Sequence, residues 1–351
     1  MSLSRIALHL NLSITTVSRA LGGHSDVSTT TRMRVEAEAL RIGYRPHEGA
    51  RRLRKGRADA VGLILPTGIG RFDDPFFLRL LSAVGPALAE AGLDLLVSSA
   101  PPGEAELAAY RHMVEGRKVD AFLLARMRAR DPRVHYLQKE AVPFVAHGRG
   151  ASRHPYAFVD TDGTAVVAQA TTRLIDFGHR DIAFIAAVGD LSFSIAREAG
   201  WRQALTEAGL PATAIFRAEP TEAGGFDAMH ALLRDVAPGN VHVSAVVCAT
   251  DRMAVGVLHA LAETGLRAGR DLSVIGFDDH AFSSHTAPPL TTIAQPIEAA
   301  GRRMVAMLTQ ILAGAEPKTL FEIMPAHLIA RASDGPAAET SRIETLKGQT
   351  L

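Results

Sequence analysis

Basic and short hydroxyl side chains are concentrated in the first 57 residues of the chain. This segment contains eleven lysines and arginines against four acidic residues, so it carries a net charge of +7, while the rest of the chain carries −6. Hydroxyl groups can approach the edges of bases, and an arginine can bind guanine or phosphate. The charge imbalance therefore indicates a polyanionic partner for this end of the chain only. The side chains expected to contact it are Ser13, Ile14, Thr15, Thr16, Ser18, Arg19 and Ser28.

Three short helices are expected to position these side chains. Apolar residues recur at helical spacing from residue 3 to 10, from 14 to 21 and from 28 to 40. Asn11 suits a tight turn, and Gly22-Gly23 ends the second helix. The expected apolar positions of the third helix are Met33, Val35, Ala37 and Leu40. A second helix with small polar and basic side chains is what the major groove requires. The charge disfavours the alternative, a three-helix bundle with a solvated basic face.

Downstream of residue 60, short apolar runs alternate with amphipathic segments. The apolar runs are residues 61–65, 93–97, 121–124, 144–146, 182–185, 245–247 and 273–275. Alternation of buried strands with helices is typical of parallel sheets that are covered on both faces. Because such sheets bind ligands at the carboxyl ends of their strands, this body is predicted to hold a small molecule.

The motifs of a nucleotide-dependent enzyme are missing from this body. Gly68 and Gly70 supply only the first two glycines of a dinucleotide-binding loop, because position 73 is Asp73. The sequence also offers no serine elbow, no paired carboxylates and no cluster with metal-ligand spacing. We therefore expect a protein that is not an enzyme and has neither a cofactor nor a metal.

The chain is expected to act in the cytoplasm. It contains a single cysteine, Cys248, which cannot form an internal disulfide. No stretch approaches the roughly 18 apolar residues of a membrane span. The first residues lack the basic, apolar and small-residue order of a signal peptide, so we expect neither export nor contact with a membrane.

The first 57 residues, called the head below, contain a series of motifs in order and without gaps. It comprises residues 12–21, then Val27-Ser28 and Thr31-Arg32, then Gly43-Tyr44-Arg45-Pro46. This series resembles the head of the LacI/GalR family of bacterial repressors. Arg5 and Leu10-Asn11 depart from the family pattern, although the apolar face of the first helix is intact. The resemblance implies a sequence-specific DNA-binding regulator that binds a palindromic operator as a homodimer.

The run from Ala50 to Arg57 is similar to the hinge helix of that family. The resemblance implies that the hinge segments of two subunits order in the minor groove, where Leu53 wedges into the central base step and Arg54 is a further contact. Such an apolar wedge bends DNA around more protein surface. The alternative is that residues 47–57 form a solvated basic linker when DNA is absent.

The resemblance continues through the body to about residue 332. The similar segments are Asp74-Pro75-Phe76-Phe77, Gly178-His179, residues 197–201, residues 251–256, residues 276–279 and Gln295-Pro296. The implied fold is an N-terminal all-α helix-turn-helix domain plus an α/β periplasmic-binding-protein-like body of two doubly wound parallel-sheet lobes. By this analogy lobe one takes residues 60–160 and 291–320, and lobe two takes residues 161–290 and 321–332. The expected domains are 1–46, the hinge 47–57, the body 58–332 and a flexible tail 333–351.

Strand ends and the resemblance together indicate the side chains that bind an effector. Arg197 and Asp278 would be the principal polar anchors, although a salt bridge that holds the lobe together is the alternative for this pair. Asp251 is equally suited to cap a helix, and one of Phe76 and Phe77 is expected in the core. The full expected set is Asp74, Phe76, Phe77, Arg149, Arg197, Thr250, Asp251, Asp278 and Gln295.

The expected effector is a small molecule bound between the lobes, with a carbohydrate favoured over a purine or another metabolite. Hydroxyl-binding groups around aromatic faces suit a sugar. The regulator is expected to act as a repressor. A periplasmic-type sugar-binding protein is the alternative, and the basic head argues against it.

Overall fold

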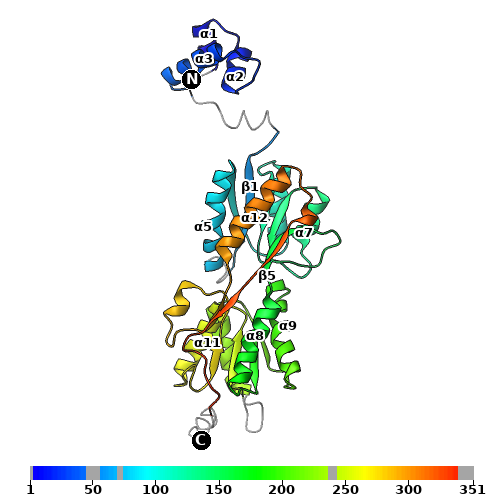
Figure 1. Ribbon diagram of the computed structural model, residues 1–351, viewed down its shortest axis with the longest axis vertical. Coiled ribbons are helices and arrows are strands. Elements are labelled where there is room, and N and C mark those ends of the chain that lie inside the picture. Colours follow the sequence, from blue (N-terminus) through cyan, green and yellow to red (C-terminus); the bar gives the residue numbers. More distant parts are fainter. Residues whose placement is uncertain (1–2, 45–55, 69–73, 236–242, 339–351) are drawn as a thin grey trace. The chain divides into compact units, whose positions relative to one another are not determined.

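The computed structural model describes residues 3–44, 56–68, 74–235 and 243–338 (Figure 1). The chain forms two compact units, Met1–Asp59 and Ala60–Leu351. None of the helices in these described stretches combines the length and the hydrophobicity that a membrane span needs.

The described residues 3–44 of the first unit form a bundle of three helices, which are α1 (Leu3–Leu10), α2 (Ile14–Leu21) and α3 (Thr29–Arg41). Ser13 and Ser28 begin α2 and α3, because each side-chain oxygen accepts a hydrogen bond from a backbone N–H three residues later, at 3.0 and 3.2 Å. Asn11 takes a φ of 53° in the turn between α1 and α2, as its residue type predicts. The fully buried side chains of Ile6 and Val17 form the centre of this small core.

The predicted inward face of α3 is wrong at three of its four positions. Met33 and Leu40 are 62% and 82% exposed and Ala37 is exposed as well, whereas the buried face consists of Val35, Glu38, Ala39 and Ile42. Residues two apart on a helix do not share a face, so Met33 and Val35 could not both point inward. Glu38 is buried because Arg41 donates to it at 2.6 and 2.7 Å and His9 lies 2.9 Å away. The hydrogen bonds from Arg41 are the main reason that the pKa of Glu38 is lowered.

Lobe one of the second unit contains a six-stranded parallel sheet in the order β11-β5-β4-β3-β1-β2. Its strands are β1 (Ala60–Pro66), β2 (Asp94–Ala100), β3 (Ala121–Leu124), β4 (Phe144–His147), β5 (Ala157–Thr161) and β11 (Phe321–Met324). Its helices are α5 (Pro75–Glu90), α6 (Glu104–Glu115), α7 (Pro132–Lys139) and α12 (Ile297–Leu312). Side chains of α5 and α12 pack on the central strands to form its core.

Lobe two contains a four-stranded parallel sheet in the order β7-β6-β8-β9. Its strands are β6 (Ile182–Ala187), β7 (Ile215–Ala218), β8 (Ala245–Cys248) and β9 (Ser273–Ile275). Its helices are α8 (Gly163–Asp176), α9 (Ser192–Glu207), α10 (Glu222–Asp235) and α11 (Asp251–Glu263). The described part of the body also contains the 3-10 turns Ala281–Ser284 and Pro317–Thr319. The predicted fold class, a helical head and a body of two parallel-sheet lobes, is confirmed.

The chain crosses between the lobes at other places than predicted. β11 pairs with β5, so residues 321–324 belong to lobe one rather than lobe two. β10 (Thr292–Ala294) is bridged to the segment after β9 through the pairs Ile275–Thr291 and Asp278–Ala294, so it belongs to lobe two. β10 also pairs antiparallel with β12 (His327–Ile329). Each crossing therefore comes a few residues later than the analogy suggested, because β10 and β11 each complete a sheet edge first.

The sequence predicted that a flexible tail begins at residue 333, but in the structure Ser333 and Asp334 are part of lobe two. Ser333 is fully buried, accepts from Thr291 N at 2.8 Å and donates to Val274 O at 2.6 Å. The Asp334 carboxylate accepts from Arg173 Nε at 2.7 Å. These polar contacts fix the segment to lobe two, while residues 339–351 lie outside the described residues.

Candidate nucleic-acid interface and interlobe pocket

The residues predicted to contact DNA lie at the exposed start of α2. Ile14 is 51% exposed although its side chain is apolar, and Thr15 beside it is exposed as well. Thr16 and Ser13 share a hydrogen bond of 2.8 Å, so both hydroxyls are held at the first turn. Ser18 is partly exposed one turn later. This arrangement gives α2 a polar surface with one apolar side chain, as expected of a helix that contacts base edges.

Arg19 is the cation of this surface and already has a partner. Its guanidinium forms an ion pair with Asp26, and both side chains are about half exposed. An exposed pair of this kind adds little stability, so a phosphate or a guanine can replace Asp26. Ser28 caps α3 and is exposed. Leu53 and Arg54 lie outside the described residues, so their assignment remains a prediction.

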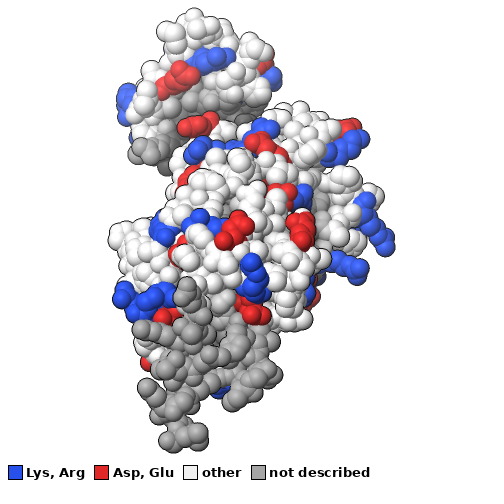
Figure 2. All heavy atoms as spheres, turned by 60° about the horizontal axis from the view of Figure 1, so that its bottom comes forward, with Lys and Arg blue, Asp and Glu red and all other residues white. Residues whose placement is uncertain are grey.

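The surface of the body differs from the basic head. On the face shown in Figure 2, basic and acidic side chains of the body are interspersed. The head alone carries the large positive excess.

Replacing Arg19 with alanine is expected to relax the choice of operator sequence. A side chain that reads a base contributes about 1–3 kcal/mol of discrimination against the wrong base pair. The check is a set of operators with single base-pair changes, titrated by fluorescence anisotropy against the wild type and Arg19→Ala. One position should lose its preference, and Arg180→Ala, an exposed arginine of the body, should preserve every preference. An equal loss of affinity across all operators would show that Arg19 binds phosphate only.

A pocket lies between the two lobes of the body. Its empty space, counted together with the part that is open to solvent, is about 630 Å³. Lobe one contributes Phe76, Arg126, Met127, His147, Gly148, Arg149, Asp160 and Thr161, lobe two contributes Gly163, Ser192, Phe193, Ala196, Arg197 and Phe277, and Gln295 lies at a crossing. Most of these residues follow the carboxyl ends of parallel strands, where such folds bind ligands.

Four of the nine predicted effector residues line this pocket: Phe76, Arg149, Arg197 and Gln295. The Arg197 guanidinium lies over the Phe277 ring, 3.4 Å from its centroid, and donates to the carbonyl of Ala249. Desolvation lowers the pKa of Arg197 to about 10, so it is still charged at neutral pH. Arg149 pairs with Asp160 at 2.8 Å within lobe one.

Asp278 lies directly behind the pocket wall. Its Oδ1 accepts from Gln295 at 2.6 Å and lies 3.5 Å from an Arg197 nitrogen. The residue is 1% exposed and has a φ of 121°, a region that few residues other than glycine adopt. Arg79 of lobe one donates to its carbonyl at 3.0 Å. Asp278 therefore connects two pocket side chains and a residue of the opposite lobe. It forms the ion pair with Arg197 that was the structural alternative, and it does not itself line the pocket.

The remaining predicted residues have structural partners and do not line this pocket. Asp74 caps α5, because its carboxylate accepts from Phe76 N at 3.1 Å, and it also pairs with Arg126. Phe77 is 4% exposed and belongs to the core of lobe one. Asp74 instead lines a second, neighbouring cavity, whereas the Phe77 ring faces the protein interior.

Thr250 and Asp251 also hold the structure of lobe two. Thr250 caps α11 by accepting from Met253 N at 3.3 Å. Asp251 is fully buried and accepts from His280 N at 3.0 Å and from the Ser283 hydroxyl at 2.6 Å. It is the first residue of α11 rather than its cap. This geometry therefore supports a structural role for Thr250 and Asp251 rather than direct contact with an effector.

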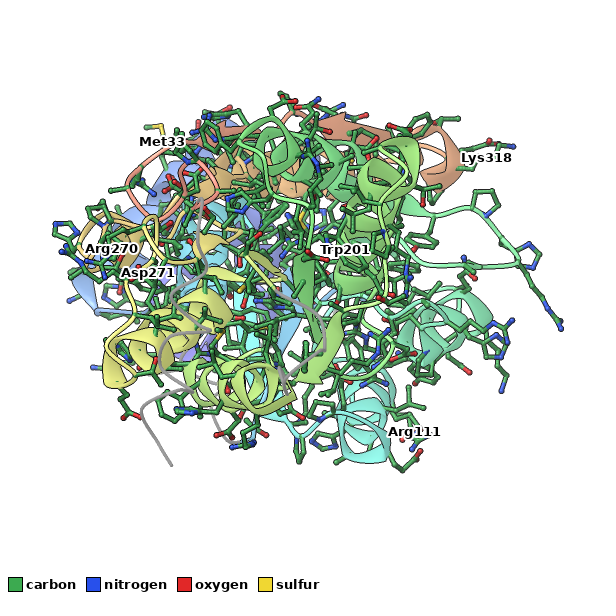
Figure 3. The ribbon with its side chains drawn as sticks, turned by 90° about the horizontal axis from the view of Figure 1, so that it is seen from below. Met33, Arg111, Trp201, Arg270, Asp271 and Lys318 are labelled. Atoms are coloured by element: carbon green, nitrogen blue, oxygen red, sulfur yellow. The ribbon has the colours of Figure 1, made fainter. Side chains whose placement is uncertain are left out.

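Several side chains that line the pocket were not in the predicted set, among them Arg126, His147 and Phe193. His147 is the last residue of β4, so the rule that ligands bind at strand ends could have found it. Phe193 is in the first turn of α9, and Arg126 follows β3 with a φ of 52°. Trp201, four residues after Arg197, does not line the pocket. It is fully buried inside lobe two, where Nε1 donates to Ile182 O at 3.2 Å (Figure 3).

His147, a side chain of the pocket, is expected to make the stability of the folded protein depend on pH. Desolvation, with Arg126 and Arg197 nearby, lowers its pKa from 6.5 to about 4. As the pH falls from about 6.5 to about 4, the unfolded chain binds a proton at this ring and the folded chain does not, so stability decreases in this window. His147→Gln is expected to flatten the fall of the melting temperature between pH 6.5 and 4. Thermal denaturation at several pH values measures this, and parallel curves for both proteins would contradict the assignment.

The fold and the pocket together define a class of protein, a DNA-binding regulator with a ligand-binding body. The model of bacterial regulatory proteins of the lacI family matches residues 2–47, and that of the periplasmic binding protein-like domain matches residues 171–333. The HTH-type transcriptional regulator RafR of Escherichia coli is 38% identical over 322 residues, which cover 91% of this chain and 94% of that protein. The chain belongs to the LacI family of bacterial regulatory proteins.

Solved structures are similar over nearly the whole chain. A complex of the transcriptional regulator CelR with cellobiose is 31% identical, has a TM-score of 0.71 and covers 95% of this chain and 99% of that one. A lac repressor dimer bound to operator and the anti-inducer ONPF is 25% identical, has a TM-score of 0.80 and shows the same coverage. The prediction of a DNA-binding transcription regulator is thereby confirmed over the alternative of a periplasmic-type sugar-binding protein.

Proposed function

We propose that the protein is a cytoplasmic repressor that binds a palindromic operator as a homodimer and changes its operator affinity when a sugar binds between the lobes. The observation that carries the sugar assignment is the make-up of the interlobe pocket. It combines the aromatic faces of Phe76, Phe193 and Phe277 with the charged Arg197 and the amide of Gln295. Aromatic faces with a few converging polar groups suit a hydroxyl-rich ring. The cellobiose bound to CelR, a relative of similar fold, supports this choice.

Within this proposal Arg197 is the direct polar anchor and Asp278 is a positioning residue. A guanidinium has only donors, so it binds the oxygen atoms of sugar hydroxyls. Asp278 holds the orientation of Arg197 and Gln295 through the contacts described above. Arg149 and Phe76 complete the contacts that we retain from the sequence-based set. No catalytic step is part of this function, since the protein acts through binding alone.

The homodimer follows from the two-fold symmetry that a palindromic operator requires, because one reading helix covers only a half-site. The lac repressor dimer on its operator, with the same fold over 95% of this chain, supports this arrangement. The hinge residues Leu53 and Arg54 are proposed to enter the minor groove between the two half-sites.

The test of DNA binding is a gel-shift assay of the full chain on fragments of its own upstream region at two salt concentrations. A single palindromic fragment should be retained with much higher affinity than a scrambled one. The affinity should fall steeply with salt, because phosphate contacts release counterions. The absence of any preference among duplexes would refute the proposed function.

A further inference from the structure

A stack of alternating rings and guanidinium groups crosses the cleft between the lobes. The Arg126 guanidinium lies 4.8 Å from the centroid of Phe76 and 4.9 Å from that of Phe193. Arg197 follows, 4.7 Å from Phe193 and 3.4 Å from Phe277. Phe76 belongs to α5 of lobe one, whereas Phe193 belongs to α9 of lobe two. A planar cation of lobe one is therefore held between aromatic rings of both lobes, within the range of cation–π attraction.

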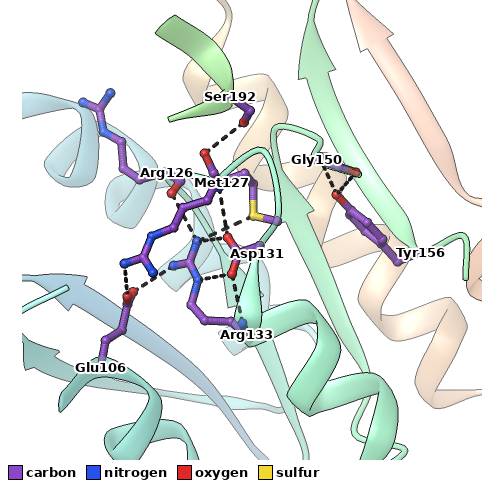
Figure 4. Close-up of polar contacts among 9 residues, drawn as sticks. Glu106, Arg126, Met127, Asp131, Arg133, Gly150, Tyr156 and Ser192 are labelled. Carbon is purple, nitrogen blue, oxygen red and sulfur yellow. Dashed lines mark hydrogen bonds and ion pairs between the residues drawn. The ribbon is translucent and has the colours of Figure 1, made fainter. Parts of the chain in front are cut away.

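The backbone of Arg126 is held in an unfavourable conformation by a buried network of charges. Its φ of 52° is in the left-handed region, which arginine seldom adopts. Arg133 donates to the Arg126 carbonyl at 3.1 Å and pairs with Asp131 and Glu106 at 2.6 and 3.0 Å. Figure 4 shows this group beneath the backbone of Arg126 and Met127. All three side chains of the group are at most 4% exposed. The network fixes the segment so that the Arg126 side chain enters the cleft.

The same segment connects the two lobes through its backbone. Ser192 N donates to Met127 O at 2.9 Å, and Ala129 N donates to Asp190 O at 2.8 Å. The Ser192 hydroxyl also donates to Met127 O at 2.9 Å (Figure 4). Residues 127–129 and 190–192 thus form an interlobe contact immediately beside the stacked Arg126.

Arg126 also separates two cavities. It lines the pocket described above and a second cavity of about 1140 Å³, partly open to solvent, which Glu106, Arg128 and Asp190 also line. Its side chain is 16% exposed and is paired with Asp74. Both cavities carry polar groups for hydroxyls. Arg126 is the lining residue that they share, while the Phe76 and Phe193 rings on either side of its guanidinium line the first cavity.

We propose that Arg126 is a displaceable plug in the effector site. Its guanidinium fills the slot between Phe76 and Phe193 that a sugar ring takes when a neutral saccharide of two or more rings binds across both cavities. Displacement of Arg126 joins the two cavities and exchanges the ring–guanidinium stack for ring–sugar contacts. Arg126 is then the residue that selects against single-ring sugars, because a single ring that takes the slot makes too few contacts in the two cavities to offset the lost stack. This inference rests on the proposed sugar effector and deepens it.

The first test is calorimetric titration of the full-length protein with glucose, galactose, cellobiose, maltose, melibiose and raffinose. One saccharide of two or three rings is expected to bind the wild type. Its affinity for Arg126→Ala should be about 5-fold higher than for the wild type, because the competing stack is gone. Arg126→Lys, which keeps the charge near Asp74 but lacks a planar face, should share part of this gain. A lower affinity for every saccharide in both variants would show that Arg126 is an anchor, and an unchanged affinity would show that it does not compete. Either result overturns the proposal.

The second test needs no saccharide. Amide hydrogen exchange of the protein without added sugar should be about 5-fold faster at Ala129 and Ser192 in Arg126→Ala than in the wild type, since the cross-lobe stack supports these bonds. The control is Arg202→Ala, whose guanidinium stacks on Trp201 and pairs with Glu198 within lobe two. Equal exchange in wild type and Arg126→Ala overturns the plug. If the wild type binds none of the saccharides, the sugar effector fails, while this exchange result still decides whether Arg126 holds the lobes together.

Discussion

Exchange of Arg197 for alanine is expected to lower the affinity for the effector sugar about 100-fold and to abolish its influence on operator binding, while the operator affinity itself is retained. Truncation of one partner in a buried, hydrogen-bonded charge contact typically costs about 2–5 kcal/mol. Arg197 is 5% exposed, lines the pocket and carries its charge at neutral pH. An effector acts only through its different affinities for two states of the protein, so the loss of its anchor removes the response and leaves the head intact.

Two further variants separate the anchor from a purely structural ion pair. Asp278→Asn keeps an acceptor for Gln295 and should weaken sugar binding less than Arg197→Ala, because Asp278 acts through its neighbours. Arg217→Ala, which removes an exposed partner of Glu198 on the same lobe, should leave both binding events unchanged. Calorimetry with sugar and anisotropy with operator DNA provide the two affinities. If Arg197→Ala and Asp278→Asn retain the wild-type sugar affinity, or if both unfold, the pair is structural.

Exchange of Leu53 for alanine is expected to reduce the affinity for the operator about 100-fold and the affinity for random DNA very little. A side chain that wedges between base steps is used only in the bent specific complex, where unstacking costs a few kcal/mol per step and the bend allows further contacts. The phosphate contacts that dominate non-specific binding stay the same. Competition titrations with operator and random duplexes at one salt concentration measure the ratio.

A second hinge substitution provides the control for Leu53. Leu53→Ile retains an apolar side chain of the same size, so it should recover most of the operator affinity if the side chain acts as a wedge. Equal losses on both kinds of DNA for Leu53→Ala, or no loss at all, would show that residues 47–57 serve only as a basic linker.

The sequence predicted the elements of this fold well because local signals define them. Ser13 and Ser28 start helices, and the apolar runs coincide with buried strands such as β3 and β6. The crossings between the lobes were placed less accurately. Whether Phe321–Met324 joins one sheet or the other depends on which strand edge is open, and only the tertiary structure decides that. The error at Met33, Ala37 and Leu40 has a different cause, because the expected face combined positions two residues apart, which a helix does not bring to one side.

The pocket was predicted where strand ends determine it and missed where two lobes build it together. Arg197 and Gln295 follow from topology, since parallel strands end at one edge of a sheet. The slot between Phe76 and Phe193 exists only because a helix of each lobe approaches the other. The sequence around Arg126 does not predict its positive φ or the buried Arg133 that supports it. Such pairings depend on distances between segments that are far apart in the chain.

The measurement that tests the central claim most directly is the mutual dependence of the two binding events. The sugar affinity of the full-length protein is measured by calorimetry with and without saturating operator DNA, and the operator affinity is measured with and without saturating sugar. If the interlobe pocket controls the head, the two ratios must be equal and differ from one, because coupling between two sites is reciprocal. The account predicts a shared factor of about 5–150, the usual range for such coupling. A sugar that binds with the same affinity to the free and the operator-bound protein would contradict it.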